Sequence, residues 1–160
     1  MWANAWPDLR LFTRTDLTYG STHVTRPRFF QRLCRRGVDL WRQVWAGKSL
    51  CVVTGTGSRF VPIAELFDSA ATVSCADTPP IDAYRHVDEL ERRLLRLPAD
   101  IIALSLGPTA TVLAARLARH GRRAIDIGHI TSSYRTVFLG HARPEQQDAP
   151  AVGHPTSAEG

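Results

Sequence analysis

The sequence predicts an α/β protein with a Rossmann-like parallel sheet of about four strands and helices on both of its faces. Four short apolar runs carry this prediction, and they are SLCVVTG (49–55), ATVSCAD (71–77), IIALSLG (101–107) and RRAIDIG (122–128). Segments with a helical spacing of apolar residues separate these runs, at 63–67, 82–97 and 109–120. Strands that are apolar along their length are typical of a parallel sheet that helices cover on both sides. Right-handed crossovers then predict the strand order 2-1-3-4.

Three regions are predicted along the chain. Residues 1–28 mix Trp, Pro, Thr and Arg without a clean period, which favours an irregular N-terminal arm. Residues 29–138 form the predicted Rossmann-like domain, and it begins with an amphipathic helix over 29–46 that Gly37 bends or interrupts. Residues 139–160 are rich in Pro, Ala, Gly and Gln, so we expect a disordered tail there.

The composition is that of an ordinary soluble globular protein, with 160 residues of which 44% are hydrophobic and 22% charged. The net charge of +5 and the pI of about 9.7 come almost wholly from arginine, because Lys48 is the only lysine. A nucleic-acid partner is one interpretation of this charge, and solvated helix faces are the other. Nucleic acid is the minor alternative, since the arginines lack the interleaved aromatic residues of a base-stacking surface.

The cysteines and the chain start predict a cytoplasmic protein. Cys34, Cys51 and Cys75 are odd in number and have no Cys-x-x-Cys spacing, so zinc binding is not expected. Cys51 and Cys75 fall inside apolar runs and are predicted to be buried free thiols in a reducing compartment. The start of the sequence has no signal-peptide pattern, and no apolar run approaches membrane-spanning length.

Two glycine-containing turns follow the first and third predicted strands, which are neighbours in the predicted order. The second turn leads from Gly107 and Pro108 to Thr109 at the start of a helix. Backbone N–H groups at a helix start are unpaired and lie at the positive end of its dipole, so they bind anions. Gly107 allows close approach to the backbone, Pro108 sets the first helical turn, and Thr109 adds a hydroxyl. We therefore predict a phosphorylated ligand at this edge of the sheet.

The first turn, TGTGSRF, contains part of a dinucleotide-binding fingerprint. Gly55 and Gly57 match its first two glycines, but Phe60 stands where the third is expected. Asp77, at the end of the second predicted strand, occupies the place of the acid that binds ribose. Ordinary left-handed turns at both glycines are the alternative.

Charged side chains lie near the same predicted crevice. Arg59 can pair bidentately with a phosphate, and a salt bridge to Glu65 is the alternative. In DIGHI, His129 is a candidate catalytic base that Asp126 can orient, although single histidines also occur for purely structural reasons.

Five segments together resemble the GT-D-type glycosyltransferase family. They are TRP (25–27), WAGKSLCVVTG (45–55), PPIDAY (79–84), LGPTATVLA (106–114) and DIGHI (126–130). LGPTATVLA followed by DIGHI is the specific part of the resemblance. It covers about 19–134 and corresponds to the carboxyl-terminal portion of the family domain.

The resemblance implies a sugar nucleotide donor such as UDP-glucose, a divalent metal ion (Mn²⁺ or Mg²⁺), and transfer of the sugar to a glycan or another hydroxyl acceptor. With the strand-end turns and charged side chains described above, the expected donor-binding residues are Gly55, Gly57, Arg59, Asp77, Gly107, Pro108 and Thr109, and the expected catalytic residues are Asp126 and His129.

The sequence departs from the family pattern in its acids. Family members carry an Asp-x-Glu metal motif before the matched region, and this sequence has neither Asp-x-Glu nor Asp-x-Asp. An acidic run usually follows DIGHI, but here residues 131–135 read TSSYR. No metal ligand is therefore assigned, and Arg59 and Arg135 are candidates to neutralise a diphosphate instead. The alternative is a non-catalytic nucleotide-binding module that acts with a partner protein supplying the missing segment.

Overall fold

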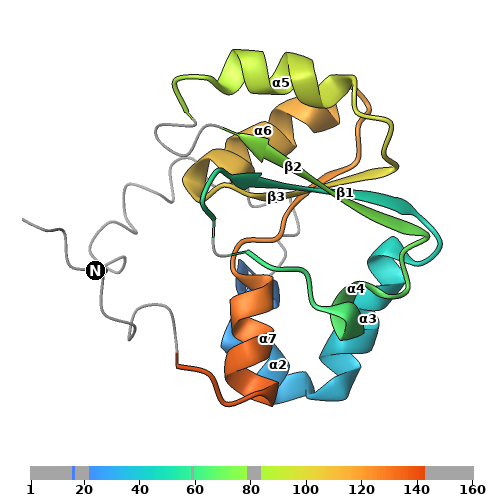
Figure 1. The fold of residues 1–160 in the computed structure, drawn as a ribbon, viewed down its shortest axis with the longest axis vertical. Helices are drawn as coiled ribbons and strands as arrows, with labels where there is room; N and C mark the ends of the chain where they lie inside the picture. Colours follow the sequence, from blue (N-terminus) through green and yellow to red (C-terminus); the bar gives the residue numbers. More distant parts are fainter. Residues whose placement is uncertain (1–15, 17–21, 59, 79–83, 143–160) are drawn as a thin grey trace, which may run out of the picture.

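The computed structural model describes residues 16, 22–58, 60–78 and 84–142. Its centre is a four-stranded parallel sheet in the order β2-β1-β3-β4 (Figure 1). The strands are β1 (Ser49–Gly55), β2 (Thr72–Thr78), β3 (Ile101–Ser105) and β4 (Ala124–Asp126). The α/β fold and the predicted strand order are both confirmed.

Helices cover both faces of the sheet (Figure 1). They are the 3-10 helix η3 (Thr22–Thr25) and the α-helices α2 (Pro27–Leu33), α3 (Arg35–Trp45), α4 (Ala64–Phe67), α5 (Val87–Leu95), α6 (Pro108–Arg119) and α7 (Ile130–Phe138). Helices α5 and α6 lie above the sheet in Figure 1, and α2, α3, α4 and α7 lie below it. Within the described ranges, no helix is both long and apolar enough to cross a bilayer.

Successive side chains of β1 belong alternately to two hydrophobic cores, one on each face of the sheet. Leu50 and Val52 belong to the core beneath the sheet, whereas Cys51 and Val53 belong to the core under α5 and α6. Trp45, which is fully buried, anchors the lower core by donating a hydrogen bond of 3.0 Å from Nε1 to the carbonyl of Leu66. The strand is apolar at successive positions because both of its faces are covered.

The helix predicted over 29–46 is broken at Cys34 and not at Gly37. Cys34 has φ 49°, the only positive φ of a non-glycine residue in the described chain, and it separates α2 from α3. Gly37 lies inside α3, where an added Cβ would meet a ring carbon of Phe29 at 3.1 Å. This glycine thus allows α2 to pack closely against α3.

The prediction that Cys75 is buried is wrong, while Cys51 is buried as expected. All three cysteines are free. Cys75 is exposed because β2 is the outer strand of the sheet, and most of its side chains are exposed on both faces. An apolar run in sequence does not distinguish an edge strand from a central one.

Residues at the start of the described chain pack on the helices below the sheet. The Ser133 hydroxyl donates to the carbonyl of Thr25 at 2.8 Å, and Trp41 Nε1 donates to the carbonyl of Val24 at 2.9 Å. Most of the predicted arm (1–15 and 17–21) and the predicted tail from 143 onward lie outside the described residues. The domain boundaries remain a prediction.

Candidate functional site

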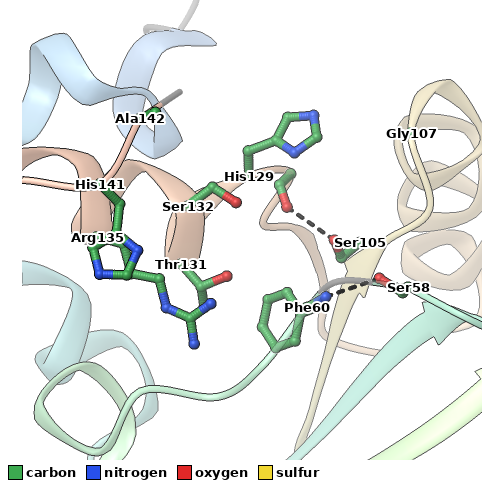
Figure 2. A pocket seen from close by; sticks show the side chains of 11 residues that line it. Ser58, Phe60, Ser105, Gly107, His129, Thr131, Ser132, Arg135, His141 and Ala142 are labelled. Carbon is green, nitrogen blue, oxygen red and sulfur yellow. Dashed lines mark hydrogen bonds between the residues drawn. The ribbon is translucent and has the colours of Figure 1, made fainter. Parts of the chain in front are cut away.

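The carboxyl ends of β1, β3 and β4 meet at one edge of the sheet, where a cavity of about 350 Å³ opens (Figure 2). The described residues that line it come from the end of β3, from the loops after β1, β3 and β4, from α7 and from the segment after α7. They are Ser58, Phe60, Ser105, Gly107, Gly128, His129, Thr131, Ser132, Arg135, His141 and Ala142. The volume is within the range of about 300–1,000 Å³ that small-molecule sites occupy.

The turn after β1 is held in place by the end of β2. Thr56 donates two hydrogen bonds of 2.7 Å to the carbonyl of Thr78, one from its backbone N–H and one from its hydroxyl. The N–H of Ser58 bonds to the carbonyl of Gly55 at 2.9 Å, which closes a tight turn around Gly57. Gly57 has φ 75°, a conformation that residues with a Cβ rarely adopt. The turn that brings Ser58 to the cavity therefore requires glycine at position 57.

The start of α6 forms the wall beside this turn. Gly107 is the N-cap residue with φ 57°, and it makes no side-chain capping bond because it has no side chain. Pro108 is the first helical residue, as the sequence predicts. Gly107 lines the cavity, while Thr109 is buried below the helix start. The first turn of α6 thus presents backbone to the cavity with no Cβ at its tip.

A network of three hydrogen bonds fixes the loop between β4 and α7. The Asp126 carboxylate accepts bonds from the Thr111 hydroxyl at 2.8 Å and from the N–H of Gly128 at 3.0 Å. The Ser105 hydroxyl donates to the carbonyl of Gly128 at 2.9 Å. His129 follows directly as the N-cap residue of α7, and its exposed side chain lines the cavity. Asp126 therefore holds the backbone that carries His129.

The structure brings only part of the predicted set to the cavity wall. Gly107 and His129 line it, and the other residues on the same strand ends lie next to the lining residues without being among them; these are Gly55, Gly57, Pro108, Thr109 and Asp126. Asp77 lies at the end of β2, where it accepts a bond of 3.3 Å from the Thr54 hydroxyl. Arg59 lies outside the described residues.

Sequence reasoning did not assign Ser58, Phe60 and Ser105 to the site. Each stands within a few residues of the carboxyl end of a predicted strand, which is the one signal that points to them. Ser58 and Phe60 lie in the segment TGTGSRF but are not glycines of the fingerprint, and Ser105 has no place in the fingerprint, so only the fold selects these side chains.

The described residues do not fit a divalent metal ion. They contain no group of three His, Cys, Asp or Glu side chains that could hold one. Asp77 and Asp126 lie at the ends of the two outer strands, and three strand spacings of about 4.8 Å separate those strands by on the order of 14 Å. Mg²⁺ and Ca²⁺ bind oxygen ligands at about 2.0–2.6 Å, so one ion does not reach both carboxylates.

Comparisons with known proteins agree with this architecture. The family model described as "Glycosyltransferase GT-D fold" matches residues 6–147. Glycosyltransferase GlyD of Streptococcus pneumoniae serotype 4 is 32% identical over 130 residues, covering 79% of this chain and 16% of that protein. The probable glycosyl transferase Gly of Streptococcus gordonii is 34% identical over 135 residues, covering 76% of this chain and 18% of that protein.

Solved structures show the same likeness. The structure described as a new glycosyltransferase (DUF1792) from Streptococcus sanguinis superposes with a TM-score of 0.76 at 28% identity, covering 87% of this chain and 53% of that chain. Another, described as the domain of unknown function 1792 with a distinct glycosyltransferase fold, gives 0.73 at 29% identity, covering 89% and 54%. The chain thus spans about half the length of these structures. It belongs to the glycosyltransferase GT-D fold family.

Proposed function

We propose that this chain is a glycosyltransferase domain that binds a sugar nucleotide, UDP-glucose or a similar UDP-sugar, and transfers the sugar to a hydroxyl of a glycan or another acceptor. The observation that carries the proposal is the cavity at the carboxyl ends of β1, β3 and β4, next to the start of α6. Ligands of open α/β sheets bind at this edge, outside the strand ends where the order of winding reverses.

The diphosphate of the donor lies against Gly107 in this proposal. The positive end of the α6 dipole attracts an anion there. Because Gly107 has no Cβ and nothing stands within 4 Å of the place of one, a phosphate can approach the backbone. The tight turn at Gly57, which carries Ser58, borders the same space.

The proposed reaction is attack of an acceptor hydroxyl on the anomeric carbon of the sugar. The acceptor oxygen forms a bond to that carbon, and the bond from the carbon to the diphosphate oxygen breaks with its electron pair on the leaving group. His129 takes the hydroxyl proton in this proposal, because its exposed imidazole lines the cavity at the start of α7. Asp126 acts as a positioning residue through its bonds to Thr111 and Gly128.

A second candidate function is nucleotide binding without turnover, in a module that completes a partner protein. Two observations favour it. No Asp or Glu lines the cavity among the described residues, and the outer strand β2 exposes most of its side chains. An uncovered edge strand is a surface onto which further polypeptide can add. We also propose a cytoplasmic location for either function, since the three thiols are free.

Ligand-dependent stabilisation tests the binding step. A ligand that binds only the folded chain adds about 2.7 kcal/mol at a hundredfold excess over its Kd. We expect UDP and UDP-sugars to raise the melting temperature, and an unchanged melting curve across these ligands and other nucleotides would contradict the proposal. Release of free sugar from UDP-glucose, measured in parallel, separates an enzyme from a binding module.

A further inference from the structure

Arg135 stands apart from the other half-buried arginines of the described chain. Four arginines are half-buried there, and three of them place the guanidinium against carboxylate or carbonyl oxygens: Arg42 against Asp68, Arg116 against Asp88 and Glu91, and Arg122 against the carbonyls of Leu97 and Ala99. The guanidinium of Arg135 makes no hydrogen bond or ion pair with any described residue.

Arg135 instead faces the cavity. It lies on α7 one turn after Thr131, so the two side chains share a helix face and both line the cavity. The N–H of His141 bonds to the carbonyl of Arg135 at 3.2 Å, which brings the chain after α7 back to the same wall. Figure 2 shows Arg135 and His141 on one side of the cavity and Gly107 on the opposite side.

This wall carries the positive charge of Arg135, and no carboxylate of the described residues lines it. The described lining also includes the imidazoles of His129 and His141 and four hydroxyl side chains. A cation that is partly removed from water costs free energy unless an anion or a set of acceptors compensates it. An anionic ligand in the cavity supplies that compensation, and a guanidinium can hold it through two parallel hydrogen bonds.

We propose that the cavity binds the diphosphate of its sugar nucleotide without a divalent cation, with Arg135 as a fixed positive charge. The proposal rests on the proposed function. It departs from what the family resemblance implies, because the described carboxylates at this edge do not fit a metal ion: Asp77 and Asp126 are too far apart, and each already accepts hydrogen bonding from the protein itself. Arg135 occupies the wall opposite the start of α6, so the diphosphate lies between them.

The same placement serves the transfer step. When the bond between the anomeric carbon and the diphosphate oxygen breaks, its electron pair stays on the leaving nucleoside diphosphate, whose negative charge therefore increases. A preorganised guanidinium at this point stabilises the developing charge. The acceptor oxygen takes the place of the diphosphate on the sugar, and its proton passes to His129.

Titration calorimetry of the full chain tests the proposal, with UDP, uridine and inorganic pyrophosphate as probes, each in EDTA and in Mn²⁺. We expect UDP and pyrophosphate to bind in EDTA with affinities within about twofold of those in Mn²⁺. In Arg135→Gln, loss of a charge-assisted contact weakens both by about tenfold to hundredfold and leaves uridine nearly unchanged. Arg135→Lys keeps the positive charge but not the planar guanidinium that forms two parallel hydrogen bonds, so we expect it to lose less affinity than Arg135→Gln.

Arg93→Gln is the matched control, since Arg93 is exposed on α5 and does not line the cavity. Binding of UDP that requires Mn²⁺ overturns the metal-free proposal and leaves the proposed function intact. Equal losses of affinity for UDP and for uridine in folded Arg135→Gln also overturn the metal-free proposal. Binding of pyrophosphate in EDTA without binding of UDP keeps the anion site and overturns the proposed donor.

Discussion

The hydroxyl of Ser105, the last residue of β3, donates a hydrogen bond of 2.9 Å to the carbonyl of Gly128 in the loop between β4 and α7. The bond connects two segments that are 23 residues apart in sequence. It fixes the loop that carries His129 relative to the turn at Gly107, so the distance between these two parts of the cavity wall stays constant. Preorganisation of this kind is what a binding site needs in order to avoid an ordering cost on each encounter.

Replacing Ser105 by alanine should loosen the cavity. We expect Ser105→Ala to lower the free energy of unfolding by about 1 kcal/mol, and to weaken UDP binding because the Gly128 loop is no longer held. Ser69→Ala is the control, since the Ser69 hydroxyl donates a bond of 2.8 Å to the carbonyl of Arg42 away from the cavity. Urea unfolding and calorimetry check both variants. Equal UDP affinity in the two would contradict the role given to Ser105.

Gly107→Ala should weaken UDP binding, and Gly121→Ala should not. Gly107 (φ 57°) and Gly121 (φ 72°) flank opposite ends of α6, and an added Cβ meets no protein atom within 4 Å at either position. Both alanine variants carry backbone strain, on the order of 1–3 kcal/mol in the free energy of unfolding, and Gly107 is the more restricted position because φ 57° with ψ −142° is adopted almost only by glycine. Only Gly107→Ala places a methyl group in the cavity, so we expect only this variant to bind UDP at least tenfold more weakly. The prediction is wrong if Gly121→Ala loses as much affinity.

His129→Gln should separate chemistry from binding. If His129 takes the acceptor proton, its loss should slow sugar transfer by on the order of 10²- to 10⁴-fold while UDP binds nearly as before. His86→Gln, an exposed histidine on the other side of the sheet, is the control. Initial rates with UDP-glucose and an acceptor check the change. Unchanged turnover in His129→Gln would remove the histidine from the mechanism.

Asp100 should contribute to the acid sensitivity of the fold. Its carboxylate accepts hydrogen bonds from the N–H (2.8 Å) and the hydroxyl (2.7 Å) of Ser49, and these bonds hold the pKa of Asp100 below its usual range. A lowered pKa in the folded state means that this stability is present above the pKa of the unfolded chain and is lost as the pH falls through the folded value. We expect Asp100→Asn to reduce stability at neutral pH and to make it depend less on pH in acid. Parallel curves for the two proteins below pH 5 would contradict this expectation.

Part of the site followed from the sequence because its signals are local. Gly107 and Pro108 mark the passage from a buried strand into a helix, and DIGHI marks the end of the next strand in the same way. Since the carboxyl ends of neighbouring parallel strands lie at one edge of a sheet, the predicted strand order already placed Gly107 and His129 near each other, and both line the cavity.

The sequence by itself thus determined the α/β class, the strand order and the edge at which the cavity lies. Tertiary structure decided which side chains are left for a ligand. In the folded chain the Asp126 carboxylate accepts hydrogen bonds from Thr111 and Gly128, whereas the Arg135 guanidinium faces the cavity without a partner among the described residues. Tertiary structure also exposed Cys75 on an edge strand. The reason is that pairing and exposure depend on which groups from distant segments come within hydrogen-bond distance, and periodicity carries no information about that.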